Sequence, residues 1–365
     1  MSNFIKMFNV QCSMFNVFYT FVLMKERNHA FDLLCGLCIL RMIVLHCVSM
    51  CGFKGCTFWF DKLMAWTFFF ICFFFFKAGY FNKSISAPTK FFLKDKFKRL
   101  FIPYLTWGAI GSIFYFGMLL LFPHELHRYW DQLEWSHVWM QSHFYGNPPV
   151  WFLFSFFCMY VMVHFMQKVS YLAYLAVFFP LVSWVLADNK IQVPMSLSNV
   201  FMGVYFFYLG KCWHWLLHKV PKQTFVFVSL VLLLVFLFGN HYWHGEYDMS
   251  LNHWVHRPWG AVVNITCALC GISGILLMLP AFRVPFVAYI GEHSMVYFVL
   301  HYPILLYYAM VHGVAGRGMN KHWDDCILVL ILIVSICTWL VPYIEKVPWL
   351  SGRWPKTVSK TVNEE

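Results

Sequence analysis

Long apolar segments recur along this chain, and they limit what it can fold into. About ten of them reach the roughly 20 residues that an α-helix needs to cross a bilayer core of about 30 Å. A composition that is 61% hydrophobic and only 12% charged excludes an ordinary soluble protein. The sequence therefore predicts an all-α, multi-pass protein of a cell membrane, which we expect to be a bacterial cytoplasmic membrane. The predicted spans lie at approximately 30–50, 58–76, 101–122, 149–167, 171–187, 198–217, 223–239, 259–281, 286–311 and 325–344.

The polar segments between these spans are too short to form a second domain. We expect one membrane domain over 24–345, an extension of unassigned role at 1–23 and a basic cytoplasmic tail at 346–365. With the N-terminus inside, the inner loops carry more than twice as many lysines and arginines as the outer loops. The positive-inside rule then places both termini in the cytoplasm. The net charge of +11 is explained by this topology and by anionic lipid, without nucleic acid.

The first span, "FDLLCGLCILRMIVLH", carries three ionisable residues: Asp32, Arg41 and His46. Charged groups inside a membrane helix are costly and so indicate a functional site. At about 100° per residue, Asp32, Cys35 and His46 lie on one stripe of the helix, whereas Arg41 points about 140° away from His46. Arg41 must therefore meet another helix or an outer cavity. His46 is suited to proton transfer near neutral pH, and a purely structural histidine is the alternative.

The span at 286–311 contains "YIGEHSMVYFVLHYPIL" and places Glu292 near its inner end. Ser294 and His301 are seven residues apart and lie on one face of a helix. A histidine in mid-span needs a polar partner, which is either a reacting group or a neighbouring helix.

The inner loop "KFFLKDKFKRLFIPYL" places Lys96, Lys98 and Arg99 before a helix that begins near Phe101. Cations beside a helix N-terminus form a good site for phosphates, such as those of coenzyme A, although anchoring to anionic lipid is an alternative. No metal site is expected: the H-x-x-H pairs at 241/244 and 253/256 match no recognised ligand spacing. A disulfide between Cys51 and Cys56 is possible in a loop on the outer side.

In this order, the blocks resemble the acyltransferase-3 family of membrane O-acyltransferases, over Arg27 to about Tyr343. The blocks are the first span with His46, "FFKAGYF", "KFKRLFIPYL", "PPVWFLFSFF" with Trp151, and "GEHSMVYFVLHYPIL" with Ser294, Tyr297, His301 and Pro303. The resemblance implies transfer of an acyl group, typically acetyl from acetyl-CoA, to a hydroxyl of a cell-surface polysaccharide, glycolipid or small molecule. No permanently bound cofactor is expected, and the partners are the acyl-CoA, the acceptor and membrane lipid.

The resemblance assigns catalysis to His46 as general base, with Asp32 and Arg41, and donor binding to Lys96, Lys98 and Arg99. The acceptor or the cavity would involve Trp151, Glu292, Ser294, Tyr297 and His301. One position departs from the family: the arginine expected eleven residues before the histidine is Cys35 here. Either Arg41, or Arg27 or Lys25 just below the helix, would then supply the missing charge. A transporter or flippase of a glycan or lipid intermediate is the alternative function.

Overall fold

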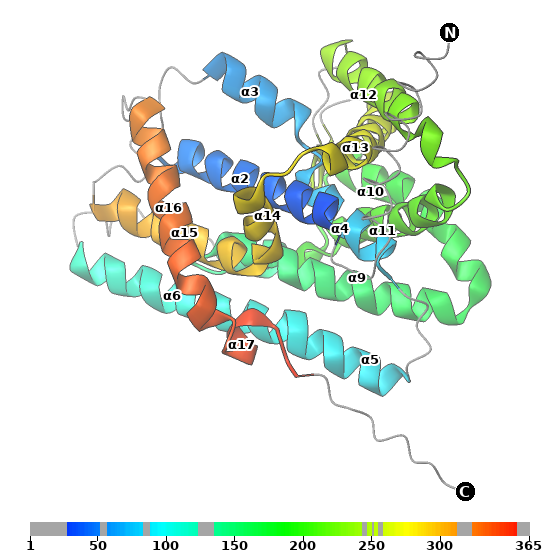
Figure 1. The fold of residues 1–365 in the computed structure, drawn as a ribbon. Helices are drawn as coiled ribbons and strands as arrows, with labels where there is room; N and C mark the ends of the chain where they lie inside the picture. The colour runs from blue at the N-terminus through cyan, green and yellow to red at the C-terminus, as the bar shows by residue number, and fades with distance from the viewer. Residues whose placement is uncertain are drawn as a thin grey trace, which may run out of the picture.

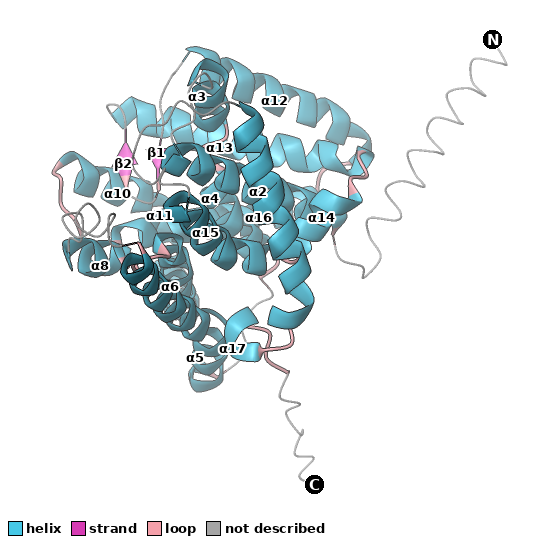
Figure 2. Cartoon of the chain, turned by 90° about the vertical axis from the view of Figure 1, so that its left-hand side faces the viewer, coloured by secondary structure: helices cyan, strands magenta, loops and turns pink. Residues whose placement is uncertain are grey.

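The computed structural model describes residues 28–51, 57–82, 88–122, 135–242, 247–249, 252–254, 258–311 and 323–355. These residues form helices and one pair of two-residue antiparallel strands, arranged as a bundle (Figures 1 and 2). The α-helices and strands are α2 (His29–Cys51), α3 (Thr57–Trp66), α4 (Phe70–Tyr80), α5 (Thr89–Lys96), α6 (Ile102–Leu121), α8 (Trp135–Gln141), α9 (Trp151–Lys168), α10 (Phe179–Asp188), α11 (Ser198–Leu217), α12 (Phe225–Tyr242), β1 (Tyr247–Asp248), β2 (His253–Trp254), α13 (Pro258–Met278), α14 (Pro285–Glu292), α15 (Ser294–Val311), α16 (Trp323–Ile344) and α17 (Pro348–Ser351). Six shorter helical segments complete the described part: η1 (Phe97–Phe101), η2 (Pro148–Val150), η3 (Ser170–Phe178), η4 (Pro194–Ser196), η5 (Lys222–Thr224) and η6 (Leu279–Ala281).

The all-α, multi-pass prediction is confirmed, with nine segments in the described residues long and apolar enough to span a membrane. The remaining one of the ten predicted spans, 198–217, corresponds to helix α11, which packs along α4 but is not among these nine segments. Its sequence includes Lys211, His214 and Asn199, which lower its mean hydropathy. The cytoplasmic placement of both termini stays a prediction.

Two predicted spans are interrupted. The span 286–311 is not one helix: α14 ends at Glu292 and α15 begins at Ser294, with a break at His293. The span at 58–76 is divided between α3 and α4 by a turn at residues 67–69. In contrast, α5 and α6 are joined by η1, a π-helical turn, into one long helical segment.

Glycines allow the central helices to approach closely. A Cβ on Gly36 of α2 would lie 1.9 Å from the Val287 carbonyl oxygen of α14, and one on Gly291 would lie 1.8 Å from the Asp32 carbonyl oxygen. Small residues at such crossings let backbones pack directly against each other, and such van der Waals packing is one of the forces that associate helices inside a bilayer. The crossing fixes α14, and with it the start of α15, against α2 (Figure 1).

Helix α2 lies between the two largest buried clusters of the bundle. Its first half packs with α4, α11 and α13, where Leu33 and Cys35 are buried. Its second half packs with α15 and α16, where Ile39 and Ile43 are buried. The ionisable residues of α2 are therefore held by neighbours on several sides.

Candidate active site

The structure brings together two histidines that the sequence places 255 positions apart. The ring centroids of His46 on α2 and His301 on α15 are 5.2 Å apart, with the rings tilted by 32°. Tyr302 packs edge-on against His46, with centroids 5.5 Å apart. His301 is fully buried, whereas His46 is partly exposed. A partly accessible imidazole therefore lies beside a buried one.

The hydrogen bonds of His301 fix its tautomer. Its Nδ1 lies 2.7 Å from the Phe298 carbonyl oxygen and 3.2 Å from that of Tyr297. Because both partners are acceptors, Nδ1 carries a proton and the neutral ring has its lone pair on Nε2. That Nε2 is buried and has no hydrogen-bond partner among the described residues. His301 thus presents a proton acceptor in the interior of the bundle, on the ring that contacts His46.

Asp32 lies near the first turn of α2, about 21 Å along the helix from His46. It is buried, and its carboxylate lies 3.7 Å from Lys77 Nζ near the end of α4. Cys35, one turn further along, is also buried. Asp32 is therefore not a direct partner of His46, and its ion pair with Lys77 belongs to the predicted inner end of the bundle.

Arg41 meets other helices, as its angular position predicted. Its Nη2 donates to the Met64 carbonyl oxygen at 2.9 Å, and its Nε donates to Thr67 Oγ1 at 3.2 Å. The guanidinium also lies over the Phe70 ring, 3.9 Å from the centroid. Arg41 therefore joins α2 to the turn between α3 and α4.

The three predicted donor-binding cations, Lys96 at the end of α5 and Lys98 and Arg99 in η1, have different neighbours. Lys96 lies over the Tyr160 ring of α9, with its Nζ 4.3 Å from the centroid. Arg99 Nε donates to Asp95 Oδ1 at 2.6 Å. Lys98 lies over the Trp354 ring, 4.8 Å from the centroid. These residues form one cluster in the sequence, whereas in the structure their side chains point in different directions around the helix axis and have separate partners.

The remaining predicted residues are distributed along α9, α14 and α15. Trp151 is buried at the start of α9. Glu292 ends α14 and Ser294 begins α15, both partly exposed. Tyr297 is fully buried, and its hydroxyl lies 2.7 Å from Thr338 Oγ1 on α16. Of this set, only His301 contacts His46 among the described interactions.

Asn147 is a residue that the sequence did not single out. It is fully buried in the loop before α9, and its Nδ2 donates to the Val299 carbonyl oxygen of α15 at 2.9 Å. Its Oδ1 has no hydrogen-bond partner among the described residues. The available signal was a polar residue between Gly146 and Pro148, directly ahead of an apolar span. Asn147 positions this loop against the helix that carries His301.

No group of three histidine, cysteine or acidic side chains in the described part of the chain could hold a metal ion. His244 and His256 of the two H-x-x-H pairs lie outside the described residues, as does Cys56 of the possible disulfide.

A family model described as an acyltransferase domain matches residues 28–342, which include α2, η1, α9 and α15. The chain belongs to the acyltransferase 3 family. This acyltransferase is therefore a multi-pass membrane enzyme that uses an acyl donor and an acceptor. No curated protein and no solved structure matches the acyltransferase.

Proposed function

We propose that this acyltransferase moves an acyl group, most simply acetyl, from a cytoplasmic acyl-CoA to a hydroxyl of a cell-surface carbohydrate or glycolipid. The contact between His46 and His301, within a chain of this family, is the observation that carries the proposal. Family membership also favours an enzyme over the transporter or flippase considered from the sequence.

In this proposal His46 is the general base. Its partly exposed ring accepts the proton of the acceptor hydroxyl, whose oxygen attacks the thioester carbonyl. The C–S bond then breaks, an ester forms, and the proton passes to the departing thiolate to give free coenzyme A. In this proposal His301 orients the ring of His46. The Nε2 of His301, which carries the lone pair in the tautomer set by its Nδ1 hydrogen bonds, is a second proton acceptor beside His46. Tyr302 packs against His46 in a T-shaped arrangement and limits its movement.

The donor is proposed to approach from the cytoplasmic side, where η1 carries basic side chains. Lys98 and Arg99 are suited to phosphate oxygens, because ammonium and guanidinium groups form strong charge-assisted hydrogen bonds with them. Lys96, the last residue of α5, lies against Tyr160 of α9. Asp32 and Lys77 lie near the predicted inner ends of α2 and α4, and they would border the path of the donor toward His46.

The test uses membrane vesicles that contain the enzyme and the native cell-envelope glycans, with radiolabelled acetyl-CoA as the probe. Label should enter the glycan fraction when acetyl-CoA is supplied to inside-out vesicles, and a His46→Ala variant should abolish this transfer. A matched control is His218→Ala, which removes an exposed histidine at the end of α11. Equal transfer by wild type and His46→Ala would refute the role of His46. Transfer only in right-side-out vesicles would refute the cytoplasmic donor side.

A further inference from the structure

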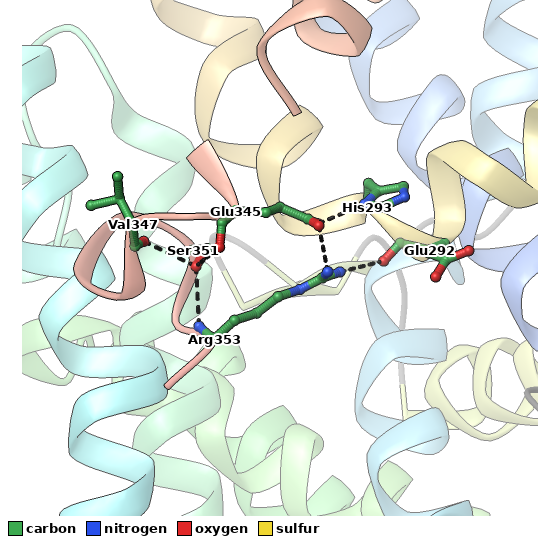
Figure 3. Close-up of polar contacts among 6 residues, drawn as sticks. All are labelled: Glu292, His293, Glu345, Val347, Ser351 and Arg353. Carbon is green, nitrogen blue, oxygen red and sulfur yellow. Dashed lines mark hydrogen bonds and ion pairs between the residues drawn. The ribbon is translucent and has the colours of Figure 1, made fainter. Parts of the chain in front are cut away.

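The end of the described chain is attached to two distant parts of the bundle. Residues 345–355, which we call the C-terminal strap, run from the end of α16 through α17 to Pro355. On one side the strap contacts the junction between α14 and α15 (Figure 3). On the other side it contacts η1 and α6, and α17 lies close to α6 (Figures 1 and 2).

Two residues of the strap, Glu345 and Arg353, form hydrogen bonds with the α14–α15 junction. Glu345 Oε1 accepts a hydrogen bond from His293 Nδ1 at 2.6 Å, and its Oε2 accepts one from Arg353 Nη1 at 2.5 Å. Arg353 Nη2 also donates to the Glu292 carbonyl oxygen at 3.2 Å. Figure 3 shows the guanidinium lying between the Glu345 carboxylate and the Glu292 carbonyl group. Arg353 thus connects the strap to the break between the two helices.

The contacts with η1 involve its backbone. Trp354 Nε1 donates to the Lys98 carbonyl oxygen at 2.9 Å, and the Trp354 ring lies beneath Lys98 Nζ. Gly352 has a φ of +68°, and a Cβ there would lie 2.3 Å from the Arg99 carbonyl oxygen. A side chain at Gly352 would therefore be strained and would displace the turn that bears Lys98 and Arg99. The strap also contacts α6: Trp107 Nε1 of α6 donates to the Leu350 carbonyl oxygen of α17 at 2.8 Å.

We propose that the C-terminal strap is a positioning element for the acyl donor. It fixes η1 relative to the α14–α15 junction, so that Lys98 and Arg99 are held in one arrangement toward the phosphates of acyl-CoA. Arg353, Gly352 and Trp354 are positioning residues, because their described contacts are with protein groups. A π-helical turn is rare and mostly occurs as a single turn inside an α-helix, frequently at a functional site, which is consistent with a role for η1 in donor binding. This inference rests on the proposed role of η1 in donor binding.

The experiment compares full-length purified enzymes in nanodiscs, with acetyl-CoA as the varied substrate and envelope glycans as the fixed acceptor. Arg353→Ala and Trp354→Phe should each raise the KM for acetyl-CoA, by roughly tenfold for Arg353→Ala because a charge-assisted hydrogen bond is lost. The kcat and the KM for the acceptor should stay within about twofold of wild type. Arg353→Lys should restore most of the donor KM, since an ammonium group can still pair with Glu345. Lys222→Ala, which removes an exposed cation from another predicted inner loop, is the matched control and should change none of these values.

Hydrogen–deuterium exchange supplies a readout that does not depend on activity. The peptide 94–101 should exchange faster in Arg353→Ala and Trp354→Phe than in wild type or Lys222→Ala. Trp354→Phe keeps a smaller aromatic ring beneath Lys98 and removes the indole N–H donor, so it remains informative if Arg353→Ala fails to fold. The proposal would be overturned if the strap variants show wild-type exchange and a wild-type KM for acetyl-CoA. It would also be overturned if they lower kcat and leave the KM for acetyl-CoA unchanged.

The same data separate this inference from the proposed donor site. If Lys98→Ala and Arg99→Ala raise the donor KM while the strap variants do not, only the positioning role fails. If Lys98→Ala and Arg99→Ala leave the donor KM unchanged, the donor site at η1 is itself refuted, whatever the exchange shows.

Discussion

Replacing Gly36 by alanine should separate the two helices that bring His46 and His301 together. The new Cβ would lie 1.9 Å from the Val287 carbonyl oxygen, whereas real Cβ contacts essentially never fall below 3.0 Å. The obstructing atom belongs to the backbone, so α2 and α14 must move apart by about 1 Å, and α15 follows directly from α14. Displacements of about 1 Å at a reacting group cost on the order of a hundredfold in rate. We therefore expect kcat to fall about a hundredfold in Gly36→Ala.

The assay is release of free coenzyme A thiol from acetyl-CoA by purified enzyme with envelope glycans, with size-exclusion chromatography to verify that the variant is folded. Gly291→Ala should behave similarly, because its Cβ would lie 1.8 Å from the Asp32 carbonyl oxygen. The matched control is Gly117→Ala in α6, where the added Cβ meets nothing within 4 Å. If folded Gly36→Ala keeps the wild-type kcat, the close crossing of α2 and α14 does not set the geometry of the histidines.

Three further substitutions test individual contacts. Tyr297→Phe should lower the free energy of unfolding by about 1 kcal/mol, measured by denaturant titration in mixed micelles, because it removes the buried hydrogen bond to Thr338; an unchanged stability would contradict this. In a double-mutant cycle, Lys77→Ala should lower the free energy of unfolding of the wild type by about 1 kcal/mol more than that of an Asp32→Asn variant. If the two substitutions are strictly additive, the ion pair contributes nothing to stability. Arg41→Lys should lose about 2 kcal/mol of stability, since a lysine cannot reproduce the guanidinium contacts with Met64, Thr67 and Phe70; wild-type stability in this variant would refute the joining role of Arg41.

The sequence predicted most of the spans and the direction of Arg41 on α2, because both follow from local periodicity and length. It could place Arg41 away from His46, and the structure confirms that Arg41 meets other helices. It could not pair His46 with His301, since angular position within one helix does not say which other helix lies opposite. That information is in the crossing of α2 and α14 at Gly36 and Gly291.

The missed features at the inner side have a similar cause. The break at His293 falls in the short polar run from Glu292 to Ser294, through which the single span 286–311 was predicted to continue. The tail from residue 346 is recognised in sequence only as basic. The path of residues 346–355 depends on contacts of Glu345, Arg353 and Trp354 with residues that are distant in the chain. Likewise, the sequence does not show that Lys77 pairs with Asp32, beside the buried Cys35.

The rate of acetyl-CoA consumption in His46→Ala, His301→Ala and the double variant tests the central claim most directly. If the two histidines act as one unit, His46→Ala and His301→Ala should each lower kcat, by on the order of a hundredfold or more for His46→Ala. The double variant should then be no slower than the slower single variant, because effects within one catalytic unit do not multiply. Wild-type kcat in His46→Ala, or losses that multiply in the double variant, would contradict the account.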